Sequence, residues 1–414
     1  MRDWRQRLTQ MLCTGLLLCS PLSKASVSIP GYELIYDAPS ETTLNAEDLR
    51  NSAEVWREMI DGAQQQIDIA QFYVADEADS RLTPVIEALR RAGERGVKIR
   101  FLLEEKGVKI STRSTLEQLE SLPNLSLRII PFGKLAGGIV HAKYWVVDGK
   151  LGFLGSQNFD WRALEHIHET GLLINNATVV AKMAAIFQQD WDAQALLAAG
   201  KSVPELGGGT PPSDVLNGNY LVASPRRWNP SDVPDSQAVL PQLLASAKKR
   251  IRVQVMDYAP LSFGENRSRP FYGVIDNALR AAVARGVQVE LMVADWNTKQ
   301  PEISWLKSLA LVPNVQIKVV TIPQASRGFI PFSRVIHSKI MTIDDRLAWV
   351  GTSNWSGGYM DNSRNLEMVM NSKKMAARLD ALYLQLWQSQ YAKVLDIRAD
   401  YPRPDPGGVR RTQQ

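Results

Sequence analysis

The second half of this 414-residue chain repeats the pattern of the first half. The triplet Arg-Gly-Val occurs at 95–97 and again at 285–287, and the pair Pro-Asn occurs at 123–124 and again at 313–314. Both spacings are 190 residues, so several elements keep one register. A long internal repeat predicts two copies of one folding unit, which limits the chain to a two-domain architecture.

Each repeat predicts alternating strands and helices. Residues 67–74 and 97–104 are short, apolar and rich in β-branched side chains, as buried strands are. Residues 84–96 lie between them with helical spacing and end at Gly96, which suits a helix C-cap. The alternation predicts an α/β fold with one α/β sandwich in each half, and we expect the two halves to be pseudo-symmetric.

A stretch rich in glycine and proline divides the halves. Residues 206–214 (LGGGTPPSD) break any regular element and mark a linker. The predicted organisation is a signal peptide at 1–25, an N-terminal domain at 26–206, a linker at 207–214, a C-terminal domain at 215–400 and a flexible tail at 401–414.

The first residues resemble a secretory signal. A basic segment is followed by a short apolar run and by Ser-Lys-Ala-Ser, which predicts cleavage after Ala25. An uncleaved membrane anchor is the alternative, although the apolar run is short for a bilayer span. Both cysteines, Cys13 and Cys19, lie in this leader, so the mature chain would have no disulfide, thiolate metal site or cysteine nucleophile. Such a chain can fold in an oxidising compartment without a bridge.

The net charge is small once the leader is set aside. The whole chain carries a formal charge of +5, and the leader accounts for +3 of it, which leaves +2. That charge is too small to identify nucleic acid or an anionic membrane as the partner from bulk charge alone.

A motif that begins with a histidine occurs once in each half. In both copies a lysine follows at +2, an aspartate at +7, a glycine at +14, a hydroxyl residue at +15 and an asparagine at +17. A glutamate follows at +28 in the first copy and at +30 in the second. The copies are His141, Lys143, Asp148, Gly155, Ser156, Asn158 and Glu169, and His337, Lys339, Asp344, Gly351, Thr352, Asn354 and Glu367.

The spacing brings the polar side chains of each copy to one place. Residues two apart on a strand face the same side, so the histidine and the lysine would project together. The small residues at +14 and +15 would let the neighbouring strand approach closely. Each half therefore offers an imidazole, an ammonium, a hydroxyl and an amide, and two halves related by pseudo-twofold symmetry would bring both sets together at their interface.

This set of groups suits phosphodiester chemistry without a metal or another cofactor. The lysines and asparagines would hold the non-bridging oxygens and stabilise charge in the transition state. One histidine would attack phosphorus to form a covalent phosphohistidine, and the other would exchange protons with the leaving and incoming oxygens. Glu169 and Glu367 are the candidates to orient the histidines through their second ring nitrogen.

Other residues near the motifs have simpler interpretations. Asp148 and Asp344 fit the hairpin turns and are expected to be structural. His166 and His168 could ligate a metal by residue type, but no second cluster supports this. The tryptophans that follow the motif asparagines, Trp161 and Trp355, are core residues by default and are also candidates to line the cleft.

The doubled pattern His-x-Lys-x4-Asp-x6-Gly-Ser/Thr-x-Asn resembles the phospholipase D superfamily over nearly the whole mature chain. The stretches HAKYWVVDG and GTSNWSGGYM look most similar to the animal lysosomal branch, whose members are known mainly as exonucleases on single-stranded nucleic acid. The resemblance implies two α/β domains, a metal-independent site between them and a phosphohistidine intermediate. The implied half-sites are His141, Lys143, Asn158 and Glu169, and His337, Lys339, Asn354 and Glu367.

The resemblance leaves the substrate open. Single-stranded DNA or RNA agrees with the similar branch and with the candidate stacking tryptophans. A phospholipid, with headgroup hydrolysis or transfer of the cardiolipin-synthase kind and peripheral contact with a membrane, agrees with the superfamily at large. A non-catalytic binding protein would keep the same fold, although both motifs are intact here. No obligate protein partner is implied.

The resemblance also bears on location and on the order of the chemistry. The lysosomal relatives carry disulfides and this mature chain has no cysteine, which indicates a bacterial exported protein of the periplasm. By analogy, His141 is favoured as the nucleophile and His337 as the general acid.

Overall fold

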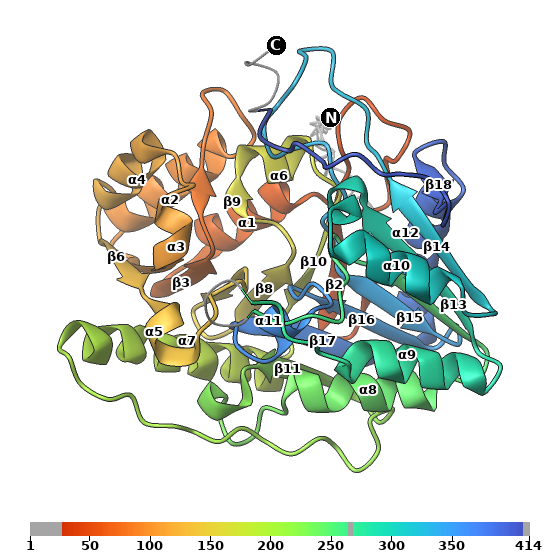
Figure 1. Ribbon diagram of the computed structural model, residues 1–414. Coiled ribbons are helices and arrows are strands. Elements are labelled where there is room, and N and C mark those ends of the chain that lie inside the picture. Colours follow the sequence, from red (N-terminus) through yellow and green to blue (C-terminus); the bar gives the residue numbers. More distant parts are fainter. Residues whose placement is uncertain (1–26, 264–267, 409–414) are drawn as a thin grey trace, which may run out of the picture.

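Two mixed β-sheets of eight strands each form the framework, one from each half of the chain (Figure 1). The structure is a computed structural model that describes residues 27–263 and 268–408. The predicted leader at 1–25 and residues 409–414 of the predicted tail lie outside the described residues. The predicted α/β class, with two pseudo-symmetric sandwiches, is confirmed.

The N-terminal half forms the first sheet and its helices. Its strands are β1 (Ser28–Ile29), β2 (Tyr32–Asp37), β3 (Gln66–Gln71), β5 (Lys98–Glu104), β6 (Leu125–Ile130), β7 (Tyr144–Val147), β8 (Leu151–Gly155) and β10 (Glu169–Ile174), and β4 (Val74–Ala75) pairs with β9 (Phe159–Asp160) in a small separate sheet. Its helices are α1 (Ser52–Gly62), α2 (Thr83–Glu94), α3 (Glu105–Val108), α4 (Arg113–Glu120), α5 (Phe132–Ala136), α6 (Trp161–Glu165) and α7 (Ala177–Ala198).

The C-terminal half forms the second sheet. Its strands are β11 (Asn219–Ser224), β12 (Arg250–Gln254), β13 (Gln288–Ala294), β14 (Val315–Val320), β15 (Ile340–Ile343), β16 (Leu347–Gly351), β17 (Asn365–Asn371) and β18 (Ala392–Val394). Its helices are α8 (Ser236–Ser246), α9 (Val274–Ala284), α10 (Glu302–Ala310), α11 (Gly357–Met360) and α12 (Lys373–Trp387), with short 3₁₀ turns at Arg226–Trp228 and Asp295–Thr298.

The two sheets have the same internal order. The first runs β1-β2-β10-β8-β7-β3-β5-β6 and the second runs β11-β17-β16-β15-β12-β13-β14-β18. In this spatial order, the seven strands from β2 to β6 in the first sheet correspond one to one with the seven from β11 to β14 in the second. Strand β1 is an addition at one end of the first sheet, and β18 is an addition at the opposite end of the second. In the matching parallel pairs, Ile67 lies opposite Ile99 and Ile251 lies opposite Val289. The repeat in the sequence is thus a duplication of structure.

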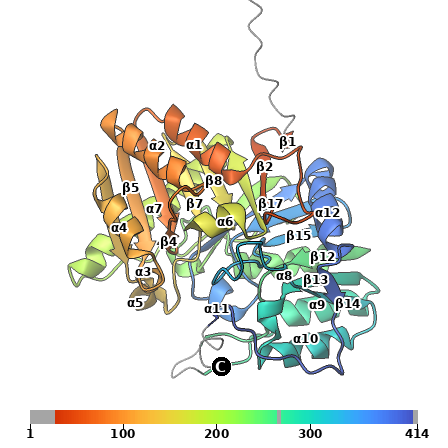
Figure 2. The same ribbon diagram turned by 90° about the horizontal axis from the view of Figure 1, so that it is seen from above.

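Apolar side chains form a layered core. The inner faces of both sheets share one cluster with the long helices α7 and α12, which includes Leu154, Met183, Val350 and Met375. Helices α1 and α2 cover the outer face of the first sheet, and α8, α9 and α10 cover the outer face of the second (Figure 2). The halves are therefore joined by a continuous apolar interior, which holds the motif segments at its edge.

Local structure follows the sequence pattern in the expected places. The helix predicted between the first two strands is α2, and Gly96 after it has φ 90°, a conformation that glycine adopts without strain. The strand predicted at 67–74 is shorter, because β3 ends at Gln71 and the chain turns toward the cleft. Among the described residues, no helix is long and apolar enough to span a bilayer.

A buried ion pair joins the halves next to the motif. Arg364, directly before β17, donates through Nε and Nη2 to the two carboxylate oxygens of Asp190 on α7, at 2.8 Å each. Its remaining N–H groups donate to Ser224 O, Asn229 Oδ1 and Trp228 O. The side chains of the pair are 0% and 1% exposed. The guanidinium is fully paired, so its burial is compensated.

We predict that Asp190→Ala lowers the free energy of unfolding by about 3–5 kcal/mol, because the substitution leaves Arg364 buried without its counter-charge. Urea denaturation measures the change. Glu117→Ala is the matched control, since the Arg113–Glu117 pair is exposed to solvent and its loss is expected to leave the midpoint unchanged. An unchanged midpoint for Asp190→Ala would contradict the prediction.

Candidate active site

Each motif histidine is held by backbone hydrogen bonds from the opposite half. The N–H groups of His141 and Ala142 both donate to Arg364 O, at 3.0 and 2.9 Å. The N–H groups of His337 and Ser338 both donate to His168 O, at 2.9 Å each. The histidines lie in extended segments that lead into β7 and β15, rather than inside these strands as predicted. Each half therefore positions the histidine of the other.

Both histidines line one cavity of about 460 Å³. The cavity opens where the parallel strands of both sheets end, since Phe72 follows β3, Met256 follows β12 and Trp296 follows β13. Asn158 of the first motif also lines it. The carboxyl ends of parallel strands are the usual place for a ligand site in an α/β sheet.

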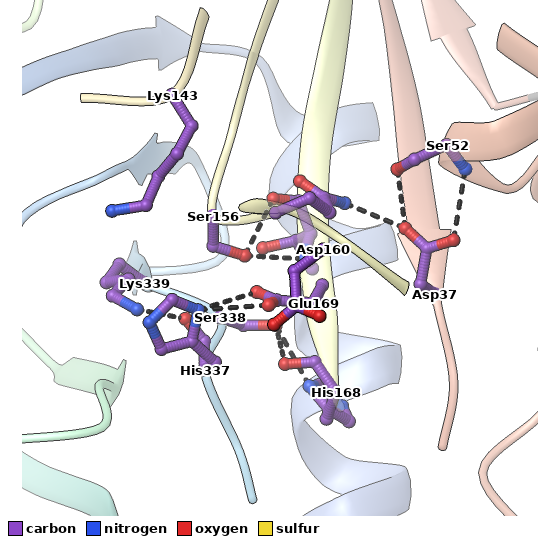
Figure 3. Close-up of polar contacts among 12 residues, drawn as sticks. Asp37, Ser52, Lys143, Ser156, Asp160, His168, Glu169, His337, Ser338 and Lys339 are labelled. Atoms are coloured by element: carbon purple, nitrogen blue, oxygen red, sulfur yellow. Dashed lines mark hydrogen bonds and ion pairs between the residues drawn. The ribbon is translucent and has the colours of Figure 1, made fainter. Parts of the chain in front are cut away.

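The two motif lysines are fully buried beside the histidines. Each donates from Nζ to the backbone oxygen of its own motif histidine, Lys143 to His141 O and Lys339 to His337 O. Figure 3 shows both lysines with the His337 ring in one region of the site. Burial lowers the pKa of Lys339 to about 7, although Glu169 opposes this, and burial and Lys339 lower the pKa of Lys143. An anion that enters would stabilise the protonated form of both.

Glu169 contacts the histidine of the other half. Both carboxylate oxygens lie 3.0 Å from His337 Nδ1, and dashed lines mark these contacts in Figure 3. Burial raises the pKa of Glu169 to about 7, with Lys339 opposing, and burial with Lys339 and Lys143 lowers the pKa of His337. The prediction that grouped Glu169 with His141 in one half-site is wrong, because β10 crosses to the opposite histidine.

A residue that the sequence analysis missed contacts the other histidine. Asn365 Oδ1 lies 3.0 Å from His141 Nδ1. Asn365 is 28 residues after His337, which is the spacing of Glu169 after His141. The equal spacing marks this residue, whereas the expectation of a carboxylate by residue type favoured Glu367.

The prediction that Glu367 orients a histidine is therefore wrong. Asn365 and Glu367 lie two residues apart on β17 and face the same side, so Glu367 is one step farther from the cleft. Its carboxylate accepts hydrogen bonds from Ser236 Oγ and Ser353 Oγ, and burial raises its pKa to about 7. A Cβ on Gly351 would lie 2.3 Å from Glu367 Cγ, so the methylene part of the Glu367 side chain lies against the motif glycine.

The motif hydroxyl groups hold neighbouring strands together. Ser156 Oγ donates to Thr170 O and accepts from Thr170 N, at 3.1 and 3.0 Å. Thr352 Oγ1 accepts from Leu366 N and donates to Asn365 Oδ1, at 3.1 and 2.8 Å. Each hydroxyl group thus fixes the strand whose side chain contacts a motif histidine, which is β10 with Glu169 for Ser156 and β17 with Asn365 for Thr352.

The motif asparagines keep unused polar atoms. Asn158 Oδ1 and Asn354 Nδ2 are buried and have no hydrogen-bond partner within the described part of the chain. Asn354 Oδ1 accepts from Asp257 N at 3.4 Å, and the Asn354 side chain also interacts with Tyr359, which lines the cavity.

The motif aspartates lie at the two hairpin turns. Asp148 has φ 52° and accepts from the backbone N–H groups of residues 64, 65 and 66, all at 2.8 Å. Asp344 has φ 53° and accepts from those of residues 248, 249 and 250 in the same way. Each carboxylate therefore joins the hairpin to the start of the neighbouring strand, outside the cavity.

The remaining candidates lie away from the cavity. His168 Nδ1 contacts Ser338 Oγ at 2.9 Å and His166 Nδ1 contacts Ser40 Oγ at 3.0 Å. Trp355 is fully buried in the second core and Trp161 is 8% exposed, and neither lines the cavity. The default expectation that both tryptophans are core residues is confirmed, and the alternative that they line the cleft is wrong.

We predict that binding of tungstate, an oxyanion that does not itself titrate in this range, takes up protons near pH 7. The affinity should fall as the pH rises from 7 to 9, by up to about tenfold per pH unit for each proton, because Lys339 must be protonated in the complex. Isothermal titration calorimetry in buffers of different ionisation enthalpy measures both quantities. Lys339→Met should weaken binding and reduce the uptake. Equal affinity across this range without proton uptake would contradict the prediction.

Comparison with known proteins gives a consistent family. The family model described as "Cardiolipin synthase, PLD-like domain" matches residues 56–191 and 240–387, one segment in each half. The chain is 30% identical over 398 residues to the "5'-3' exonuclease PLD3" of Rattus norvegicus, which covers 87% of this chain and 79% of the relative. It is 33% identical over 385 residues to "Phospholipase D Z" of Dictyostelium discoideum, covering 84% and 87%.

Solved structures share the fold at low sequence identity. A phosphatidylserine synthase from Haemophilus influenzae Rd KW20 matches with a TM-score of 0.58 at 12% identity, over 83% of this chain and 85% of that one. A polyphosphate kinase from Porphyromonas gingivalis matches with a TM-score of 0.54 at 14% identity, over 92% and 52%. Because the family model covers both halves and the curated relatives align with most of the sequence, the chain belongs to the phospholipase D superfamily, in the part of it that includes the animal PLD3 proteins.

Proposed function

We propose that this phosphodiesterase cleaves single-stranded nucleic acid from an end, through a covalent phosphohistidine and without a metal. The aromatic lining of the cavity carries the proposal. Phe72 and Tyr73 come from one half, and Trp296, Phe332 and Tyr359 come from the other. Bases of any sequence stack on such rings, and they do so when they are unpaired.

Charge around the cavity supports the same substrate. Lys109 is exposed at its wall, and Arg162, which pairs with Asp160, also lines it. Cations placed along a cleft hold successive phosphates of a strand. The relative from Rattus norvegicus carries the name of a 5'-3' exonuclease, which agrees with a substrate that enters by its end.

The chemistry follows from the groups beside the cavity. A phosphodiester between His141 and His337 would have Lys143 and Lys339 beside its non-bridging oxygens, and Asn158 lines the same cavity. The ring of Tyr359 lies edge-on to His141, with centroids 4.7 Å apart, and restricts the imidazole from one side. Attack by one histidine and proton transfer by the other would then cleave the ester.

A phospholipid substrate is the second candidate. Ile110 and Phe332 line the cavity with 54% and 53% of their surface exposed, and such apolar side chains at a cleft mouth also suit an acyl chain. The relative from Dictyostelium discoideum is named a phospholipase D. Transfer of the headgroup would require an alcohol in place of water as the acceptor.

We propose that the enzyme acts outside the cytoplasm, in the periplasm, because residues 1–25 resemble a secretory signal and the rest of the chain contains no cysteine. The alternative is an anchor that is not removed. Mass spectrometry of an osmotic-shock fraction is the test. A mature N-terminus at Ser26 supports export, and an intact leader in the membrane fraction contradicts cleavage.

The substrate is tested by incubating the protein, with EDTA present, with a 5'-hydroxyl single-stranded oligonucleotide and with phosphatidylglycerol vesicles. Stepwise shortening of the oligonucleotide, lost in His337→Ala, is the expected result. Phosphatidic acid or cardiolipin from the vesicles, with an intact oligonucleotide, would contradict the nucleic-acid proposal and support the second candidate.

We predict that Trp296→Ala lowers kcat/KM on the oligonucleotide by about tenfold or more, because a stacked base loses its platform. Steady-state kinetics on the oligonucleotide and on bis(4-nitrophenyl) phosphate measure the effect, and the small diester should show a much smaller loss. Trp305→Ala is the matched control, since Trp305 contacts Phe271 outside the cavity. Equal losses on both substrates would contradict base stacking.

A further inference from the structure

The two motif histidines have chemically different partners at equivalent positions. Glu169 and Asn365 follow the two residues, His168 and Arg364, whose carbonyl oxygens hold the opposite histidine segment. Glu169 therefore presents a carboxylate to His337 Nδ1, and Asn365 presents a carboxamide to His141 Nδ1. The backbone hydrogen bonds are the same at the two positions, so the difference at Nδ1 lies in the side chain that faces it.

The orientation of the Asn365 amide is fixed by its other contacts. Asn365 Nδ2 donates to Tyr359 O at 2.9 Å, and a carbonyl oxygen can only accept. Thr352 Oγ1 donates to Asn365 Oδ1 at 2.8 Å. The amide oxygen must therefore face His141, and it cannot donate. His141 Nδ1 consequently carries the proton, which leaves the lone pair on Nε2 in the neutral ring.

The surroundings of His141 disfavour a second proton. Lys143 on its own segment and Lys339 and His337 from the other half face it, and burial with these charges lowers its pKa. The Tyr359 ring covers it on the side of α11. The nearby carboxylate of Glu104, at the end of β5, accepts from Val140 N. The ring of His141 is thus held neutral, with Nε2 available to attack.

The pair of Glu169 and His337 can hold a variable number of protons. When the pair holds two, Nε2 of His337 carries one of them whether the other lies on Nδ1 or on the carboxylate, whose pKa is raised to about 7. When it holds one, that proton lies between Nδ1 and the carboxylate, and Nε2 is free. The pair can therefore donate a proton from Nε2 and later accept one there.

We propose that Asn365 is a positioning residue, whose amide fixes the tautomer of His141 and gives it no carboxylate with which to hold a second proton, whereas Glu169 lets His337 hold and release one. This difference supplies a structural cause for the order that the resemblance implies, with His141 as the nucleophile and His337 as the proton carrier. The inference rests on the proposed phosphohistidine chemistry but not on the identity of the substrate.

The diester is cleaved in two steps. His141 Nε2 forms a bond to phosphorus, the bond from phosphorus to the leaving oxygen breaks, and that oxygen takes the Nε2 proton of His337. Water then gives a proton to His337 Nε2 and forms a bond to phosphorus as the bond to His141 breaks. Because the amide cannot take the Nδ1 proton, the phosphorylated ring stays cationic, which makes it a better leaving group.

The first test measures the pH dependence of kcat/KM on the oligonucleotide for two near-isosteric variants. Asn365→Asp should move the acid limb upward by about one to three pH units, because a carboxylate favours the protonated, non-nucleophilic His141. Glu169→Gln should move the alkaline limb downward, because His337 then loses its Nε2 proton at lower pH. A loss of rate at every pH without movement of either limb would indicate a merely structural function and overturn the proposal.

Asn365→Ala separates charge from folding in this test. It should lower the rate without raising the acid limb, since it adds no carboxylate, and thermal denaturation confirms that it folds. An equal upward shift in Asn365→Ala and Asn365→Asp would overturn the assignment to charge.

The second test traps the intermediate with bis(4-nitrophenyl) phosphate, whose leaving group needs no proton. His337→Ala should release one equivalent of nitrophenolate in a burst and then stall, because water has lost its base. Mass spectrometry should place the phosphoryl adduct on His141, and His141→Ala should form none. An adduct on His337 in the wild-type enzyme or in His141→Ala would overturn the proposal.

The two proposals fail differently. If the wild-type enzyme cleaves the nitrophenyl diester but not the oligonucleotide, the nucleic-acid substrate is wrong while the adduct still decides which histidine attacks. If the wild-type enzyme cleaves neither, both proposals are overturned.

Discussion

Each histidine is held by a carbonyl oxygen of the other half, and the rest of the site depends on this exchange. A buried carbonyl that loses its donors costs free energy, so the two crossing segments stabilise the interface as well as the histidines. Arg364 links the two functions directly, because its carbonyl oxygen holds His141 while its guanidinium is paired with Asp190. A change that separates the sheets would therefore separate the reacting groups.

The charged groups around this crossing are unusual in their burial. Lys143, Lys339 and Glu169 are all fully buried. Burial lowers the pKa of both lysines and raises the pKa of the glutamate, which in each case favours the neutral form. In the site without ligand, burial thus disfavours the charged form of each of these groups. A phosphate monoanion restores the positive charge of the lysines and is in turn stabilised by them, so binding and protonation are linked.

The sequence was sufficient for the parts of the site that depend on spacing within one half. The repeat predicted both sheets, and the motif aspartates were correctly expected at turns, since an aspartate in the left-handed conformation of a hairpin turn is a local feature. The partner of each histidine was not predictable in this way, because it depends on how two distant segments cross. The choice of Glu367 followed residue type, whereas Asn365 was marked by its spacing.

The aromatic residues show the same division. Trp161 and Trp355 lie next to the motifs, but Trp355 is covered by the second core and Trp161 is almost fully buried. Trp296 and Phe332 lie in connections far from the motifs in sequence, where no local pattern distinguishes a cleft residue from a surface one. Only the packing of the halves brings these connections to the cavity.

Duplication within one chain has a consequence for the pair of Glu169 and Asn365. Two identical subunits related by an exact twofold axis must present the same side chain to both histidines, so neither histidine can specialise through its partner. A chain that carries both halves is free of that restriction, because each copy can be substituted alone. The covalent link between the sheets is therefore what permits an acid on one side of the cleft and an amide on the other.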